Sequence, residues 1–138
     1  MEYKISHSPP PCYEEAKKKF GVNFFRDRVV FTYGDTIHFY KGNIDPDLIA
    51  HESVHIKQHA AYSGGPEAWW RKYLDDGDFR LSQELEAYRA QYEYILKYYK
   101  KKTHFDHLHF YAKSLCTIYG LKMTIEDAMN LISNYEKI

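Results

Sequence analysis

The sequence predicts an α+β fold, a small β-sheet near the N-terminus with helices covering one of its faces. Residues 28–41, RVVFTYGDTIHFYK, hold two β-branched and aromatic runs joined at Gly34-Asp35, a pair suited to a hairpin turn. From residue 45 onward, capping residues and glycine stops divide the chain into segments of helical length. A chain of 138 residues can bury a core without disulfides, so residues 1–138 are predicted to form a single domain.

Local signals place the elements of the first half. Three consecutive prolines at 9–11 enforce an extended entry, and residues 12–21 then carry acids first, lysines last and a glycine stop. That order matches the helix macrodipole and predicts a short helix. Strands are expected near 28–33 and 36–41. Asp45 and Pro46 suit the cap and first turn of the next helix, which is expected to end at Gly64-Gly65.

The second half is predicted to be helical. Residues 66–74, PEAWWRKYL, suggest a short helix, on which adjacent Trp69 and Trp70 cannot face one side. One tryptophan is therefore expected to pack and the other to be partly exposed. The remaining segments are a turn at 75–78, a long helix over 81–102, a helix over 104–120, and a last helix opened by Thr124 and Asp127 in capping-box-like spacing.

Charge and composition exclude several classes of partner. Nineteen basic and nineteen acidic residues cancel, so no global field attracts nucleic acid or an anionic membrane. No apolar run approaches the roughly 20 residues of a membrane helix, and the start lacks the apolar core of a secretory signal. Two cysteines without CxxC spacing are read as reduced thiols. We expect a cytoplasmic protein without nucleic acid or membrane partners; the sequence does not indicate an oligomeric state.

The segment AHESVHIKQH, residues 50–59, contains the pattern HExxH. On a helix, residues four apart lie one turn above each other, so His51 and His55 project toward one point and can chelate a metal ion. Glu52 lies beside that point and can accept a proton from a bound water molecule. His59 continues the series, but its further turn carries it about 6 Å along the axis, so it is expected not to be a ligand.

A catalytic zinc site needs a third protein ligand and an open position for water. The later stretch LSQELEAYRAQYEYIL offers Glu84 and Glu86. Helical periodicity aligns Glu84 with Tyr88 and Gln91 beside an apolar stripe, whereas Glu86 falls on a charged face. Glu84 is therefore predicted to point inward and Glu86 toward solvent. An inward glutamate without a cation at helical spacing is costly to bury, and a zinc ion opposite it would remove that cost.

HESVHIKQ followed by ELEAYRAQ resembles the small gluzincin-type zinc metallopeptidases, the minigluzincin-like proteins found in phages and mobile elements. The resemblance covers roughly residues 28–95. It implies a helical zinc-binding subdomain beside a small sheet, one zinc ion per chain on His51, His55 and Glu84, Glu52 as general base, and a peptide or protein substrate cleaved as by a metalloendopeptidase. Many gluzincins place an aspartate four residues after the glutamate ligand. Here that position is Tyr88, whose hydroxyl would substitute in orienting a histidine.

The family resemblance also implies that an extended peptide binds by β-augmentation at a strand edge beside the active helix. The hairpin ending in TIHFY, residues 36–40, is the candidate, although an ordinary sheet edge explains it as well. His104, His107 and His109 gather at the start of a later helix, where one can reach the cleft as an oxyanion donor or all can be surface residues. Cys12 is a minor candidate for an inhibitory zinc thiolate.

Three alternatives to hydrolysis remain. A metal-bound but catalytically silent domain would bind a protein or peptide, as a phage accessory protein would. A di-iron carboxylate protein would use the ExxH pairs Glu52–His55 and, with Asp in place of Glu, Asp106–His109. A nucleic-acid-binding module is the weakest alternative, because the basic run at 94–102 is the only one in a chain of zero net charge.

Overall fold

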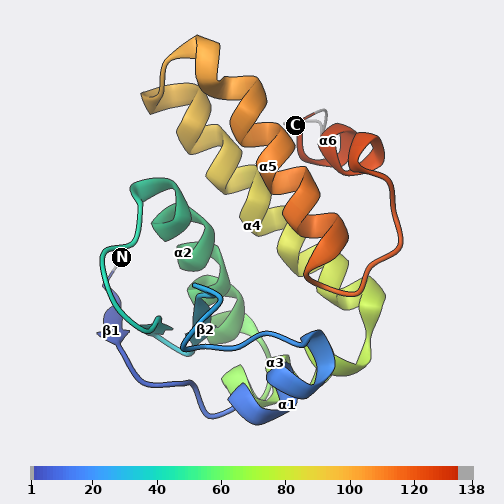
Figure 1. The fold of residues 1–138 in the computed structure, drawn as a ribbon. Coiled ribbons are helices and arrows are strands. Elements are labelled where there is room, and N and C mark those ends of the chain that lie inside the picture. The colour runs from blue at the N-terminus through green and yellow to red at the C-terminus, as the bar shows by residue number, and fades with distance from the viewer. Residues whose placement is uncertain (1, 134–138) are drawn as a thin grey trace.

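A computed structural model describes residues 2–133 (Figure 1). Its sheet has three short strands in the order β1-β3-β2, with β3 parallel to β1 and antiparallel to β2. The strands are β1 (Lys4–Ser6), β2 (Phe31–Tyr33) and β3 (Thr36–His38). The hairpin is confirmed with shorter strands than predicted, and the parallel strand β1 was not predicted. Because β3 is the central strand, a peptide could extend the sheet at this hairpin only along β2, the edge strand.

Six helices lie in the described part of the chain, which confirms the α+β class. They are α1 (Tyr13–Phe20), α2 (Pro46–Ala61), α3 (Gly65–Asp75), α4 (Gly77–Tyr98), α5 (His104–Thr117) and α6 (Ile125–Ser133), with a 3-10 turn η1 (Lys101–Thr103) before α5. Residues 134–138, also predicted to be helical, lie outside the described residues. No helix over residues 2–133 has the length and apolar character needed to cross a bilayer.

Several helix boundaries differ from the sequence prediction, the start of α4 among them. Helix α4 begins at Gly77 rather than 81, because the Asp76 side chain accepts a hydrogen bond from the backbone N–H of Phe79 (3.1 Å) and caps the helix there. The turn predicted at 75–78 is therefore shorter in the structure. Asp45 occupies the N-cap position of α2 but makes no side-chain capping bond. The capping prediction holds for α6, where the Thr124 hydroxyl accepts from the Asp127 N–H (3.0 Å).

Trp69 and Trp70 are both buried, with exposed fractions of 1% and 7%. The Trp69 indole N–H donates to Gln83 Oε1 on α4 (2.8 Å), and the Trp70 indole N–H donates to the carbonyl of Thr32 on β2 (2.9 Å). The prediction that one of them is partly exposed is wrong, because α3 fills a corner in which each indole finds both apolar neighbours and a hydrogen-bond acceptor.

Helix α2 lies between the sheet and α4, and this placement builds the site. Ile56 of α2 packs with Ile37 and Phe39 of the sheet side in a small apolar cluster. On the other side of α4, α5 runs alongside it and α6 covers both (Figure 1), around a core that includes Ile95 and Leu115. The face of α2 toward α4 carries polar side chains instead, and they are buried.

Candidate metal centre

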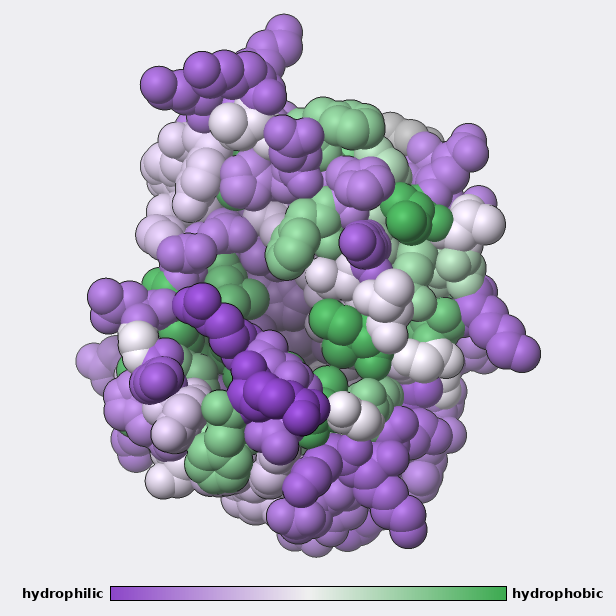
Figure 2. Space-filling view, in the orientation of Figure 1, coloured by the Kyte–Doolittle hydropathy of each residue, from purple (hydrophilic) through white to green (hydrophobic). Residues whose placement is uncertain are grey.

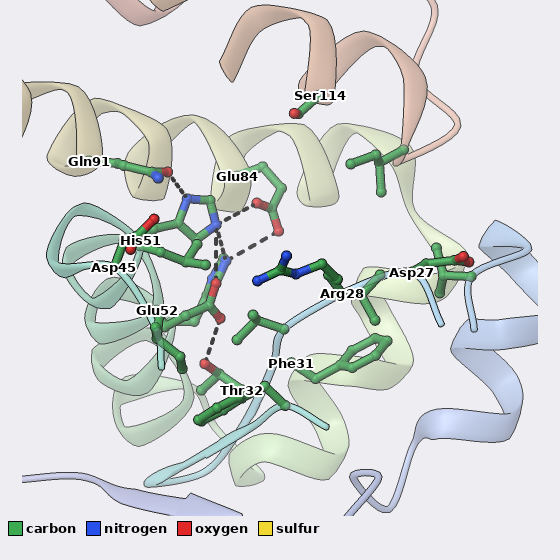
Figure 3. A pocket seen from close by; sticks show the side chains of 18 of the residues that line it. Asp27, Arg28, Phe31, Thr32, Asp45, His51, Glu52, Glu84, Gln91 and Ser114 are labelled. Atoms are coloured by element: carbon green, nitrogen blue, oxygen red, sulfur yellow. Dashed lines mark hydrogen bonds and ion pairs between the residues drawn. The ribbon is translucent and has the colours of Figure 1, made fainter. Parts of the chain in front are cut away.

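His51, His55 and Glu84 converge between α2 and α4, and each offers one ligand atom within 4.8 Å of the others. The Nε2 atoms of the two histidines lie 3.2 Å apart. His51 Nε2 is 3.1 Å from Glu84 Oε1, and His55 Nε2 is 3.2 Å from Glu84 Oε2, as the dashed lines in Figure 3 show. All three side chains are buried, whereas Glu86 is exposed. The predicted orientations of both glutamates are confirmed, and the group can hold a metal ion.

A buried hydrogen-bond chain fixes the protonation of His51. Gln91 Nε2 donates to the Asp47 carboxylate (2.8 Å), which leaves Gln91 Oε1 facing His51 Nδ1 (3.0 Å). The Tyr111 hydroxyl donates to the same Asp47 oxygen, and burial together with Asp47 raises the pKa of Tyr111, so it keeps its proton. Because an amide oxygen only accepts, His51 Nδ1 carries the proton and the Nε2 lone pair faces the cluster.

His55 is fixed in the same tautomer by a different chain. Its Nδ1 lies 2.8 Å from Gln58 Oε1. The Gln58 amide nitrogen donates to the Gln83 carbonyl (3.1 Å) and to Glu86 Oε1 (2.8 Å), so its oxygen is the atom turned toward the histidine. His55 Nδ1 therefore donates, and Nε2 is the ring nitrogen that faces Glu84.

The Nε2 atoms of two imidazoles and a carboxylate thus face one point. Glu84 Oε1 is buried and accepts no hydrogen bond from any described residue, because its close neighbour His51 Nε2 is itself an acceptor. Burial alone would raise the pKa of Glu84, but His55 and His51 hold it well below its usual range. Burial alone would lower the pKa of His55, but Glu84, with Glu52 and Gln58, raises it to about 9. The cluster demands a positive charge, and the donor set suits a metal ion.

Glu52 lies beside this group without belonging to it. Its Oε1 accepts a hydrogen bond from the Thr32 hydroxyl of β2 (2.8 Å), and its Oε2 is 3.7 Å from His51 Nε2. Burial raises the pKa of Glu52, although the two histidines oppose the shift. The sheet therefore holds one carboxylate oxygen and leaves the other turned toward the cluster.

Aromatic side chains orient the remaining atoms. The Tyr73 hydroxyl donates to Glu84 Oε2 (2.7 Å), and burial followed by Glu84 raises the pKa of Tyr73, so it remains a donor. Tyr88 packs its ring edge-on against His51, with centroids 4.5 Å apart, while its hydroxyl pairs with the Tyr119 hydroxyl (2.9 Å). The predicted role of the Tyr88 hydroxyl in orienting a histidine is wrong; Gln91, one turn further along α4, has that contact.

Four other candidate residues of the sequence do not belong to the cluster: His59, Cys12, Asp106 and His109. His59 Nδ1 accepts from the Gly34 N–H (2.9 Å) and ties the hairpin to α2; burial, with His55 nearby, lowers its pKa to about 3. Cys12 is buried in an apolar cluster with Tyr13, where burial raises the pKa of its thiol to about 12, so it is no thiolate ligand. Asp106 and His109 are exposed and absent from the ligand group of the described residues, which removes the di-iron pairing.

His107 alone of the three later histidines lines the same pocket as the cluster. His104 Nε2 instead donates to the Tyr99 carbonyl (2.9 Å) beside the start of α5, and His109 is exposed. Of these three histidines, only His107 is therefore placed to act as an oxyanion donor.

The cluster lies in a cavity of about 1550 Å³. One wall is the segment 22–31, the other consists of residues of α4, α5 and the turn after α5, and the walls include many aromatic side chains. Figure 2 shows this face hollowed in its middle, with hydrophobic side chains on several sides of the opening and strongly hydrophilic ones along its lower left edge. Phe25, Tyr40, Phe110 and Ile118 line it while remaining largely exposed. The arrangement gives an extended ligand access to the metal-binding group.

Several contacts that orient the site residues were not predicted from the sequence. Gln91 lies seven residues after Glu84 on the same helical face, and Gln58 lies three residues after His55; both spacings are visible in the sequence. Asp47 lies four residues before His51, a helical spacing that is likewise visible in the sequence. Thr32 and Tyr73 had no local signal, since their contacts depend on how the sheet and α3 pack.

Comparison of the chain with models of protein families, with curated proteins and with solved structures found no match. The fold and the site therefore define a class only by their own geometry: a small α+β protein with a buried His-His-Glu group between two helices. Any function is argued from that group and its surroundings.

Proposed function

We propose that this chain is a zinc-dependent metallopeptidase of the gluzincin type, minigluzincin-like in its arrangement, that cleaves peptide bonds with one zinc ion per chain. The supporting observation is the convergence of two histidine Nε2 atoms and the Glu84 carboxylate on one point, beside a second carboxylate, Glu52, that takes no part in the group.

The donor set favours zinc over other metals. Two imidazole nitrogens and one carboxylate oxygen are the ligands of a well-known catalytic zinc arrangement, whereas calcium and magnesium prefer oxygen alone. Three protein ligands leave a position open for a water molecule. His51, His55 and Glu84 would hold the ion, with Gln91, Gln58 and Tyr73 fixing their orientation.

When bound, zinc supplies Lewis acidity, which acidifies a water molecule and polarises the scissile carbonyl. Glu52 has the position of the general base: Thr32 holds Oε1, and Oε2 faces the cluster and receives the water proton. The same oxygen then delivers that proton to the leaving amine.

The pocket suits an extended peptide with large apolar side chains. Its walls are rich in aromatic residues and run past the cluster between the segment 22–31 and α5. The free edge of β2 is partly used, because the Thr32 carbonyl accepts from Trp70. We therefore place the peptide against the aromatic walls rather than as an added strand beside β2.

Metal content tests the site directly. Protein purified without added metal, measured by elemental mass spectrometry, is expected to contain one zinc per chain, lost in Glu84→Ala and retained in Glu67→Ala, a control at an exposed position of α3. A peptide library then tests hydrolysis, with zinc-loaded Glu52→Gln as the inactive reference. One zinc without cleavage of any peptide would instead favour a catalytically silent peptide-binding domain, and two irons per chain would overturn the proposal.

A further inference from the structure

Arg28 has an unusual backbone conformation. Its φ is 56°, and among residues 2–133 it is the one non-glycine residue with positive φ. Side chains other than glycine, asparagine and aspartate rarely adopt this left-handed region, because Cβ crowds the following carbonyl. The conformation interrupts the segment before β2, where the sequence predicted a strand from residue 28. An arginine kept in a strained conformation invites the question of what its side chain does.

The Arg28 side chain is directed into the cavity. It lines the same pocket as His51, Glu52, His55 and Glu84, and Figure 3 shows its guanidinium pointing toward the cluster. The described residues provide it with no hydrogen bond or ion pair. Its neighbour Arg26, by contrast, pairs with Asp27 at 2.9 Å. A permanent positive charge with five donors thus faces the pocket and has no hydrogen-bond or ion-pair partner among residues 2–133.

The charge of Arg28 is not needed to neutralise the carboxylates of the cluster. A divalent cation on His51, His55 and Glu84 would offset the two carboxylates of Glu52 and Glu84, so neither needs Arg28. The Arg28 side chain is also exposed, whereas an oxyanion donor works best in a site that excludes water. An exposed guanidinium at the mouth of an aromatic cavity matches recognition of a planar anion from outside, and carboxylate is the planar anion of peptides.

We propose that Arg28 binds a carboxylate of the substrate close to the scissile bond, either the C-terminal carboxylate or the side chain of an acidic residue. This assignment rests on the proposed peptidase function. It makes Arg28 a specificity-determining residue: peptides that combine large apolar side chains with a nearby carboxylate are the preferred ligands, and the left-handed backbone at residue 28 aims the guanidinium at them.

The first experiment compares two small ligands by calorimetry on zinc-loaded protein. Benzylsuccinate has one carboxylate for the metal and a second for Arg28, while hydrocinnamate has the same aromatic ring and only one carboxylate. A charge-assisted, bidentate pair is expected to make benzylsuccinate roughly 10- to 100-fold tighter. In Arg28→Gly the ratio is expected to fall to about one, because glycine suits the left-handed backbone and leaves the fold intact.

Two controls separate recognition from structure and from net charge. Arg71→Gln removes an equal charge from the exposed face of α3, where Arg71 pairs with Glu67, and should retain the benzylsuccinate preference. Arg28→Gly should melt no lower than the wild type. An unchanged preference in Arg28→Gly, or a clearly lower melting temperature of that variant, would overturn the assignment and make residue 28 a structural position.

A second set of ligands identifies the source of the carboxylate. Zinc-loaded Glu52→Gln binds without cutting, so three otherwise identical apolar peptides can be compared: one with a free C-terminus, one amidated, and one amidated with an internal Gln→Glu change. We expect one of the two carboxylate peptides to bind about tenfold tighter than the neutral one, with the gain lost in Arg28→Gly. Equal binding of all three peptides refutes the proposal.

The two proposals fail in different ways. Absence of turnover with every peptide refutes the peptidase function and leaves the ligand ratios of the zinc-loaded protein measurable, whereas absence of zinc binding refutes both proposals. A ratio near one in both wild type and Arg28→Gly refutes the role of Arg28, even in a protein that binds zinc and cleaves peptides.

Discussion

Gln91→Leu is expected to weaken zinc binding without removing any ligand. The change keeps the volume of the side chain but leaves the buried Nδ1–H of His51 without its acceptor, which costs about 1–3 kcal/mol. It also deprives Asp47 of one of its two donors. Loss of such an orienting partner lowers metal affinity by about 10- to 100-fold, and competition with a chromophoric chelator measures this directly.

Tyr88→Phe is the matched control for Gln91→Leu. It removes the hydroxyl that pairs with Tyr119 and retains the ring packed on His51, so zinc affinity should be unchanged while stability falls by about 1 kcal/mol. Nitrogen-detected NMR of the histidines should show the Nδ1–H tautomer for His51 in the wild type. Equal zinc affinity in Gln91→Leu and wild type, or reduced affinity in Tyr88→Phe alone, would refute the assignment of Gln91.

Three further predictions concern the metal and the core. Glu52→Gln should bind zinc as the wild type does and lose hydrolysis, as shown by elemental analysis beside a peptide assay; parallel loss of metal would make Glu52 a ligand. Because the raised pKa of about 9 keeps His55 protonated at pH 7, zinc binding should release about one proton and tighten as pH rises toward 9. Calorimetry in buffers of different ionisation enthalpy measures that proton. Leu115→Ala, fully buried in the core, should destabilise by about 2–5 kcal/mol in denaturant titration and leave zinc stoichiometry intact.

The part of the site that was predictable from sequence is the part that depends on helical period. His51 and His55 lie four apart on one helix, and Glu84 falls on the inward face of another, so each orientation follows from local spacing alone. The same reasoning placed Glu86 outward, as it is. The hairpin and the helices were also predictable from short-range signals, namely turn residues, glycine stops and capping residues.

The missed features depend on contacts between distant parts of the chain. Gln91 reaches Asp47 across 44 residues, and Tyr111 reaches it across 64, so neither pairing has a local signature. Both tryptophans of α3 are buried because sheet and α4 approach them from different sides. Strand β1 is three residues long and pairs in parallel with β3, and nothing in Lys4–Ser6 itself marks it as a strand.

HExxH by itself is weak evidence, because any helix with two histidines and a glutamate can show it. In a chance occurrence, the histidine tautomers are free and nearby polar groups can donate to Nε2. Here two glutamine amides, each turned by its own carboxylate, Asp47 or Glu86, hold both Nδ1 protons away from the cluster. The third residue facing it, Glu84, has an oxygen with no donor. These arrangements are independent of the motif, and they leave a buried negative charge that either a proton on His55 or a bound metal ion offsets. The polar shell around HESVH, rather than the motif, therefore makes the strongest case for a metal centre.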